Sequence, residues 1–440
     1  MKVLKFGGTS VGTIDNMNAV MKIVTDGEKK IIVLSAMSGT TNDLIEISDY
    51  FAKDNKDEAQ SKINRLENKY KKIIKSLYKT KEKEEEASVY IKKSFKKIKS
   101  YLSEDFDENG KNAIIGQGEL MSTAMFSILM NENGNDTKLL PALDFMRIDE
   151  NKTANVHTIK KLLLDVIEKT GDAKYYVTQG FICRNDQGEI DNLQRGGSDY
   201  SASLIGAAID AEEIQIWTDI DGIHNNDPRF VKNTKKIEYL SFNEAAELAY
   251  FGAKILHPQT ILPAKLHNIP VRLKDTMKPD DSGTLISSEV QGSGIKAVAA
   301  KDGITAIKIR SSHMLLAYGF LKNIFEIFEF FKTPIDMIST SEVAVSLTID
   351  ETKKLDGIVK ELKEYGNVIV DKNMTIICIV GNIIAEEKGF AGKVFSALEG
   401  IPIRMISYGG SRYNISILIP TDQKQKTLQA ISDHILNQPG

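Results

Sequence analysis

The sequence predicts an α/β protein in which a mainly parallel sheet is followed by two smaller α/β repeats. From residue 1 to about 290, short apolar runs such as Ile31–Leu34 alternate with helical patterns and end in polar or glycine-bearing loops. This alternation is typical of a parallel sheet covered by helices on both faces. After a stretch rich in proline, glycine and aspartate at about 275–294, strand and helix patterns recur twice in the order βαββαβ.

These patterns place three domains along the 440 residues. We expect the first at 1–290, with an inserted helical hairpin at about 50–110 whose dense lysines and glutamates form a solvated face. The first repeat covers 303–373 and the second covers 374–440. The second repeat ends on its helix, so we expect residues 295–300 to supply its missing strand, which would interleave the two repeats in sequence.

Composition limits the classes of partner. The formal net charge is −3, and lysines are interleaved with glutamates, so no nucleic-acid partner is expected. Cys183 and Cys378 lie far apart without metal-ligand spacing, which predicts buried reduced thiols and no protein-held metal cluster. We expect no apolar run long enough to span a bilayer and no signal peptide. The sequence therefore predicts a cytoplasmic protein without a membrane partner.

The segment Lys5–Gly12, KFGGTSVG, directly follows a short apolar strand and precedes a helical pattern. Glycines let a backbone approach an anion, and successive N–H groups with a helix N-terminus supply partial positive charge. The segment lacks the Gly-Lys-Ser/Thr ending of a Walker A loop and the G-x-G-x-x-G spacing of dinucleotide sites. It predicts a phosphate-binding loop, with Lys5 at the strand end as its cation.

Further loops follow strands at Ser35–Asn42, Thr178–Phe181 and Thr218–Gly222. In parallel sheets ligands bind beyond the carboxyl ends of the strands. We therefore expect these loops and the phosphate-binding loop to share one site.

Two charged residues suit an α-amino acid. Arg195 can bind an α-carboxylate with two hydrogen bonds. Glu119, at the start of a helical segment, can bind an α-ammonium, although acidic residues are also common in first helical turns.

Five segments in this order resemble aspartokinases of the amino-acid-kinase fold, and the repeats resemble their tandem ferredoxin-like ACT domains. The segments are Lys5–Gly12, Ser35–Asn42, Gly118–Ser122, Arg195–Asp199 and Phe251–Pro258. The resemblance implies ATP- and Mg²⁺-dependent phosphorylation of the side-chain carboxylate of L-aspartate to 4-phospho-L-aspartate. That reaction begins the pathway to lysine, threonine, methionine and isoleucine.

The resemblance also implies roles for individual residues. The expected catalytic residues are Lys5, Asp199 and Lys254. Aspartate would contact Ser35, Thr41, Glu119, Phe181, Arg195 and Ser198. The nucleotide would contact Lys5, Gly7, Gly8, Ser10, Thr218, Asp219, His224, Arg229 and Lys254. For Asp199 three roles stay open: holding the substrate ammonium, supporting Lys5 or facing magnesium.

His224 departs from the family pattern, which carries a tyrosine at this position, so nucleotide affinity can differ. The ACT pair resembles lysine-sensitive monofunctional enzymes, and the resemblance implies a homodimer or dimer of dimers through these domains. The effector would contact Met314, Gly319, Phe320, Leu321, Ile335, Asp336, Thr340, Ser341 and Glu342. Ala317 replaces a frequent serine, so lysine and threonine both stay open as inhibitors.

Two alternatives remain. One is another kinase of the same fold acting on glutamate, N-acetylglutamate, carbamate or UMP. The other is an amino-acid sensor with an inactive kinase domain. The ACT pair, Glu119 and the Arg195–Asp199 motif argue against the first. The intact charged residues Lys5, Glu119, Arg195, Asp199 and Lys254 argue against the second.

Overall fold

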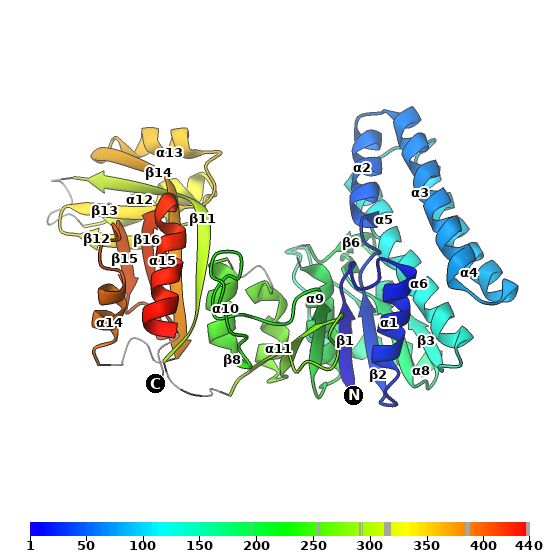
Figure 1. Cartoon of the computed structure of the whole chain (residues 1–440). Coiled ribbons are helices and arrows are strands. Elements are labelled where there is room, and N and C mark those ends of the chain that lie inside the picture. Colours follow the sequence, from blue (N-terminus) through cyan, green and yellow to red (C-terminus); the bar gives the residue numbers. More distant parts are fainter. Residues whose placement is uncertain are drawn as a thin grey trace. The chain divides into compact units, whose positions relative to one another are not determined.

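The computed structural model describes residues 1–194, 196–252, 256–289, 292, 294–311, 318–382 and 388–436. They divide into two compact units, one of residues 1–222 and 256–288 and the other of residues 223–255 and 289–440 (Figure 1). Residues 223–255, which we expected in the first domain, therefore belong to the same unit as the two repeats.

The first unit is built on a sheet. Seven strands of this unit lie side by side in the sheet, in the order β3-β4-β2-β1-β7-β9-β10. Strands β1, β2, β3, β4, β7 and β9 run parallel, and β10 runs antiparallel to β9. The strands are β1 (Lys2–Phe6), β2 (Lys30–Leu34), β3 (Thr137–Leu140), β4 (Tyr175–Gln179), β7 (Ile214–Thr218), β9 (Val271–Asp275) and β10 (Thr284–Ser287). A separate hairpin consists of β5 (Ile182–Arg184) and β6 (Ile190–Asn192). The parallel core agrees with the predicted fold class.

The helices of this unit form two layers on the sheet. They are α1 (Ile14–Val24), α2 (Thr40–Ala52), α3 (Lys56–Leu77), α4 (Lys81–Ser100), α5 (Glu108–Ile115), α6 (Gln117–Glu132), α7 (Ala142–Phe145), α8 (Val156–Thr170), α9 (Gly197–Ala208) and α11 (Leu262–Leu266), with a 3₁₀ turn η1 (Pro258–Thr260). Helices α1 and α6 bury apolar side chains against the sheet face that carries Leu4, Phe6 and Leu34. Since neighbouring strand residues point to opposite faces, Lys5 lies on the other face, where α9 contacts β1.

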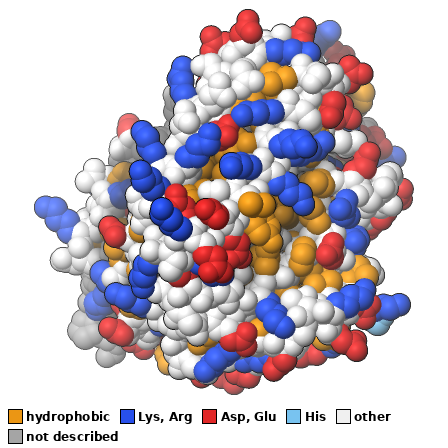
Figure 2. Space-filling view, turned by 90° about the vertical axis from the view of Figure 1, so that its right-hand side faces the viewer, with side chains coloured by type: hydrophobic (Ala, Val, Ile, Leu, Met, Phe, Trp, Pro, Cys, Tyr) orange, Lys and Arg blue, Asp and Glu red, His pale blue; other side chains and the backbone are white. Residues whose placement is uncertain are grey.

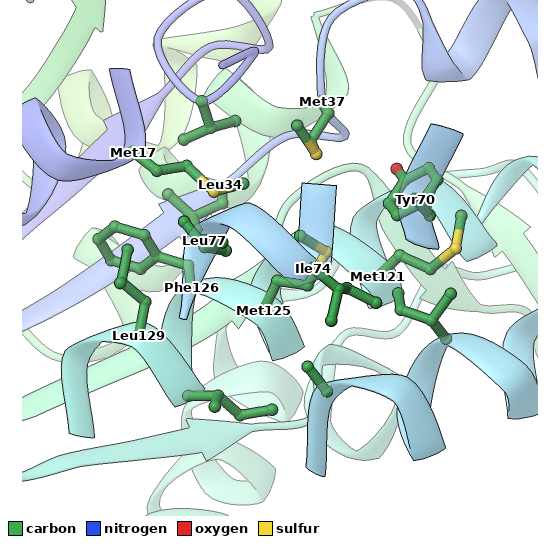
Figure 3. Close-up of a cluster of buried hydrophobic side chains, with 14 of the residues drawn as sticks. Met17, Leu34, Met37, Tyr70, Ile74, Leu77, Met121, Met125, Phe126 and Leu129 are labelled. Carbon is green, nitrogen blue, oxygen red and sulfur yellow. The ribbon is translucent and has the colours of Figure 1, made fainter. Parts of the chain in front are cut away.

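The insertion forms the long antiparallel helices α3 and α4 (Figure 1). It is part of the core of the unit, because Tyr70 and Ile74 of α3 lie among Met121 and Met125 of α6 (Figure 3). The Tyr70 hydroxyl also lies 3.1 Å from the Thr40 hydroxyl at the start of α2. The outer faces are charged, as predicted, and acidic side chains are interspersed among lysines and arginines on the surface that Figure 2 shows.

One helical stretch, residues 108–132, is long and apolar enough to cross a membrane, contrary to our expectation that no such run exists. It comprises α5 and α6, and 94% of its most apolar window is buried inside the protein. Its apolar character is that of a helix in the core.

The second unit contains a sheet in the order β12-β13-β11-β14-β16-β15. Its elements are β8 (Tyr239–Ser241), α10 (Phe242–Tyr250), β11 (Gly294–Arg310), α12 (Phe320–Phe330), β12 (Ile338–Ser341), β13 (Ala344–Ile349), α13 (Leu355–Leu362), β14 (Asn367–Asn382), α14 (Phe390–Ala397), β15 (Met405–Tyr408), β16 (Asn414–Pro420), a 3₁₀ turn η3 (Thr421–Gln423), α15 (Lys424–Ile431) and a π-helical turn η4 (Ser432–Leu436). The fold is that of two βαββαβ repeats.

Strands β11 and β14 each serve both repeats. Residues 305–310 of β11 pair with β13 of the first repeat, whereas residues 294–301 pair with β14 residues 376–382, which belong to the second. The second repeat thus receives a strand from before the first repeat. The predicted boundary between the repeats, at residues 373 and 374, lies inside one continuous strand, β14, which pairs with β11 along most of its length.

Candidate active site

Four parallel strands end at the same edge of the first sheet. Strand β1 leads into Gly7 and Gly8, β2 into Ser35, β4 into Gly180 and Phe181, and β7 ends at Thr218. Because β4, β2, β1 and β7 are neighbours, the loops that the sequence analysis singled out lie along one edge. This is the position where ligands bind in open parallel sheets.

Two glycines allow these loops to approach one another. A Cβ atom on Gly8 would lie 2.8 Å from the Ala36 carbonyl oxygen, and one on Gly180 would lie 2.6 Å from the Ser198 Cβ atom. Both distances are too short for real side chains, so only glycine permits this packing. The close approach places the loop after β1 against the loop after β2, and the loop after β4 against the start of α9.

Lys5 pairs with Asp199 at this edge. Lys5 Nζ lies 2.7 Å from Asp199 Oδ1, and their side chains are 12% and 17% exposed. Asp199 lies in the first turn of α9, which begins after Gly196 in a left-handed conformation. This pairing is the geometry expected if Asp199 supports Lys5, which is one of the three roles left open for it.

Two donors of the predicted phosphate loop have partners within the protein. The Gly7 N–H donates to the Trp217 carbonyl oxygen at 3.3 Å. The buried Ser10 hydroxyl lies 2.7 Å from the Thr276 hydroxyl. Thr276, which follows β9, was not predicted, because no sequence motif links it to residues 1–12.

Glu119 is the most deeply buried charged residue among the described residues of the predicted active site. It lies in the first turn of α6 and is 3% exposed. Its Oε1 atom accepts a hydrogen bond of 3.1 Å from the Ala36 N–H, whereas Oε2 is buried without a hydrogen-bond partner among the described residues. Burial raises the Glu119 pKa from 4.5 to about 7. A bound ammonium group would supply the missing partner and restore the charged form.

Hydroxyl groups surround the same loops. The Ser35 hydroxyl donates to the Ser198 hydroxyl at 3.0 Å, which joins β2 to the start of α9. Thr41 is half-buried in the first turn of α2. The site therefore contains serine and threonine hydroxyls beside the Lys5–Asp199 pair.

Phe181 adopts a left-handed backbone conformation, with φ of 68°. This conformation is uncommon for a bulky residue and costs roughly 1–3 kcal/mol. Two hydrogen bonds hold it: the Phe181 N–H donates to the Ser201 hydroxyl at 2.9 Å, and the Leu193 N–H donates to the Phe181 carbonyl oxygen at 2.8 Å. Such constrained residues are typical of ligand sites. Ser201 is a second contributor that sequence patterns did not indicate.

Arg195 and Lys254 lie outside the described residues. The expected nucleotide residues occur in both units. Thr218 donates to the exposed Asp219 carboxylate at 3.1 Å in the first unit. In the second unit, His224 Nδ1 lies 2.9 Å from the Thr234 hydroxyl, and Arg229 forms an ion pair of 2.6 Å with Asp227.

The expected effector residues lie in the first repeat, except Met314, which is outside the described residues. Gly319, with φ of 83°, precedes α12, where Phe320 is buried and Leu321 is exposed. Ile335 is half-buried, and Thr340, Ser341 and Glu342 are exposed on β12 and its turn.

The Asp336 side chain is only 3% exposed and is held by two groups. Lys301 Nζ lies 2.6 Å from its Oδ1 atom, and the Tyr250 hydroxyl donates to the same oxygen at 3.1 Å. Lys301 also pairs with Asp350 at 2.9 Å. Burial is the main reason that the Asp336 pKa is raised, and Lys301 opposes the shift. Lys301 and Tyr250 were not predicted, because they are distant from Asp336 in sequence.

Comparisons with known proteins agree with this architecture. Residues 1–275 match the amino acid kinase family, and residues 377–435 match an ACT domain. Lysine-sensitive aspartokinase 3 of Escherichia coli is 30% identical over 98% of both chains. The chloroplastic aspartokinase 1 of Arabidopsis thaliana is 32% identical over 98% of this chain and 79% of its own length.

Two solved structures are similar to this protein over 99% of its chain and over the full length of the solved chains. Aspartokinase III of Escherichia coli, in complex with aspartate and ADP, superposes with a TM-score of 0.82 at 31% identity. The aspartate kinase of Clostridium acetobutylicum superposes with a TM-score of 0.85 at 27% identity. On the full-length match in sequence and fold, the chain belongs to the amino acid kinase family, in its aspartokinase branch.

Proposed function

We propose that this aspartokinase transfers the γ-phosphoryl group of ATP to the side-chain carboxylate of L-aspartate, as the first step of the aspartate-family amino acid pathway. The observation that carries the proposal is the buried Glu119 carboxylate, whose Oε2 atom has no hydrogen-bond partner among the described residues, at the sheet edge that holds the Lys5–Asp199 pair. An ammonium site beside a cation at a glycine loop suits an amino acid and a nucleotide phosphate. The similar Escherichia coli structure contains aspartate and ADP.

In this reaction an oxygen of the substrate carboxylate forms a bond to the γ-phosphorus while the bond from phosphorus to the departing ADP oxygen breaks. A carboxylate is already ionised at neutral pH, so no general base is needed. Catalysis then depends on alignment and on neutralising the phosphoryl oxygens. We assign that neutralisation to Lys5 and Lys254, the α-carboxylate of aspartate to Arg195, and its ammonium to Glu119.

Magnesium fits this site as a companion of the nucleotide. Among the described residues there is no group of three or more histidine, cysteine, aspartate or glutamate side chains that could hold a metal ion. Mg²⁺ usually keeps water and phosphate ligands and takes only one or two carboxylates. Asp219, exposed at the end of β7, and Asp199 are carboxylates that would contribute. The ion would supply charge neutralisation at the phosphates.

We further propose that lysine inhibits the enzyme by binding the first ACT repeat. Two comparisons support lysine over threonine: the Escherichia coli relative is lysine-sensitive, and a T-state structure of it contains lysine and aspartate. The buried Asp336 carboxylate suits an effector ammonium. An effector inhibits only if it binds the inactive arrangement more tightly than the active one. A homodimer or dimer of dimers through the ACT repeats is part of this proposal.

The test is the trapping of acyl phosphate by hydroxylamine with ATP, magnesium and aspartate, titrated with lysine and with threonine. We expect acyl phosphate to form with aspartate, and we expect lysine to suppress its formation. Product that is suppressed only by threonine would retain the kinase and reject the effector assignment. No product with aspartate would reject the proposed reaction.

A further inference from the structure

The first unit contains a cavity of about 620 Å³ on the sheet face opposite Lys5. Its floor includes Leu4 of β1 and Trp217 of β7, and its sides include Lys22 of α1 and the loop at Thr276. Leu4 and Lys5 are neighbours in one strand, so their side chains point to opposite faces of the sheet. The cavity is therefore separate from the Lys5–Asp199 pair.

The lining is rich in positive charge. Lys2, Lys22, Lys30 and Lys274 border the cavity, whereas its acidic lining among the described residues consists of Asp26 and Asp280. Some of this charge is already compensated, because Lys30 pairs with Asp26, and Lys2 pairs with Glu28 at 2.8 Å.

The pKa values of two of the lysines are lowered. Lys30 is 2% exposed, and burial, together with Lys2 and Lys174, lowers its pKa to about 8 in spite of Asp26. Burial and the nearby Arg272 also lower the Lys274 pKa. Lys274 Nζ lies over the Trp217 ring, 4.8 Å from its centre. Buried cations that repel one another favour the binding of an anion.

We propose that this cavity is a binding site for a small organic anion that carries phosphate or carboxylate groups. Its volume lies within the range of about 300–1,000 Å³ that is usual for small-molecule sites. The lysines would contact the anionic groups, and Leu4 and Ile23 would contact the carbon skeleton. Binding does not require the proposed kinase reaction, so the two proposals fail independently.

Thr276 connects the cavity to the glycine loop of the proposed active site. Thr276 lines the cavity, its hydroxyl pairs with Ser10 of the glycine loop, and its N–H donates to the Thr218 carbonyl oxygen at 2.9 Å. A probe could therefore bind at either site. The experiment must distinguish the cavity from the glycine loop.

Trp217 is the single tryptophan of the chain, so its fluorescence reports on the cavity directly. We would titrate the full-length protein with inorganic pyrophosphate and, separately, with citrate, and measure affinity by calorimetry. We expect a saturable change in Trp217 emission with at least one probe. Each of Lys22→Met and Lys274→Met should weaken the calorimetric affinity about ten-fold, because each removes a charged partner of the anion.

Lys92→Met, the same substitution at an exposed position of α4, is the matched control and should bind like the wild type. Lys5→Ala should retain binding if the probe occupies the cavity. Because Lys22 is exposed, Lys22→Met provides a test even if Lys274→Met fails to fold. The proposal is overturned if neither probe binds, or if binding survives Lys22→Met and is lost in Lys5→Ala.

Discussion

Two buried carboxylates, one in each unit, differ in how they are compensated. Glu119 in the first unit is 3% exposed as a whole residue, and the side chain of Asp336 in the second unit is also 3% exposed. The pKa of each carboxylate is raised. One oxygen of each lacks a hydrogen-bond partner among the described residues. Glu119 receives a backbone N–H at its other oxygen, whereas Asp336 receives the Lys301 ammonium and the Tyr250 hydroxyl.

The difference suggests two ways of preparing a site for an ammonium ligand. The ionised form of Glu119 carries a desolvation penalty that no internal cation offsets among the described residues, so an ammonium ligand would stabilise it strongly. Asp336 is already paired with an internal ammonium, and an effector must replace or rearrange that pair. We therefore expect substrate binding to depend on Glu119 more strongly than effector binding depends on any one residue around Asp336.

The largest effect is expected for Glu119→Gln. The amide keeps the shape of the side chain but cannot pair with the substrate ammonium as a charge. Losing a charge-assisted hydrogen bond should raise the KM for aspartate roughly ten- to hundred-fold. Initial rates at saturating ATP measure this. Glu132→Gln, at the other end of α6, is the control and should leave the KM unchanged; an unchanged KM in Glu119→Gln would remove Glu119 from the substrate site.

Asp336→Asn tests the regulatory carboxylate. We expect the half-inhibitory concentration of lysine to rise about ten-fold or more, because the ammonium of the effector loses its charged partner. Activity without lysine should stay close to that of the wild type. Inhibition curves at fixed aspartate and ATP measure the effect. Normal inhibition in this variant would show that the effector does not use Asp336.

The sequence alone could predict the site around Glu119 but not the residues that surround Asp336. The glycine loops, the parallel strands and Glu119 follow from local patterns, so the edge of the sheet could be located in advance. The partner of Asp199 stayed open because it depends on where α9 packs. Lys301 and Tyr250 were missed for the same reason, since strand pairing and the packing of residues 223–255 with the repeats bring them to Asp336.

The raised pKa of Glu119 predicts a pH dependence of folding stability and of aspartate binding. The native pKa is about 7, above the ordinary 4.5, so between these pH values the native protein holds a proton that the unfolded chain lacks. Burial of Glu119 therefore lowers the free energy of unfolding progressively as the pH rises from 4.5 to 7. Above pH 7 this loss does not grow further.

Aspartate needs the ionised form of Glu119, so its affinity should rise several-fold from pH 6 to pH 8. Calorimetric titrations in two buffers with different ionisation enthalpies should also detect proton release on binding at pH 6.5. Glu119→Gln should remove both effects. A flat profile in the wild type would contradict the assignment.

Lys301→Met tests whether the internal ammonium competes with the effector. Without Lys301, Asp336 would lose its cation, and an effector ammonium would gain a vacant partner. We expect the half-inhibitory concentration of lysine to fall a few-fold, together with a lower melting temperature, because a largely buried ion pair is broken. Inhibition curves and thermal unfolding measure the two effects. Weaker inhibition would instead show that Lys301 supports the effector site.

The smallest effect is expected in the second repeat. The segment Thr333–Met337, TPIDM, corresponds to Ile401–Met405, IPIRM, so Arg404 occupies the position of Asp336. Its charge is opposite, and it pairs with Asp371 at 2.7 Å, with both side chains 35% exposed. An exposed pair contributes little, and an arginine cannot bind an ammonium. Arg404→Met should therefore change lysine inhibition less than two-fold. A change as large as that in Asp336→Asn would mean that the two repeats contribute equally, and that burial of the carboxylate does not decide where the effector binds.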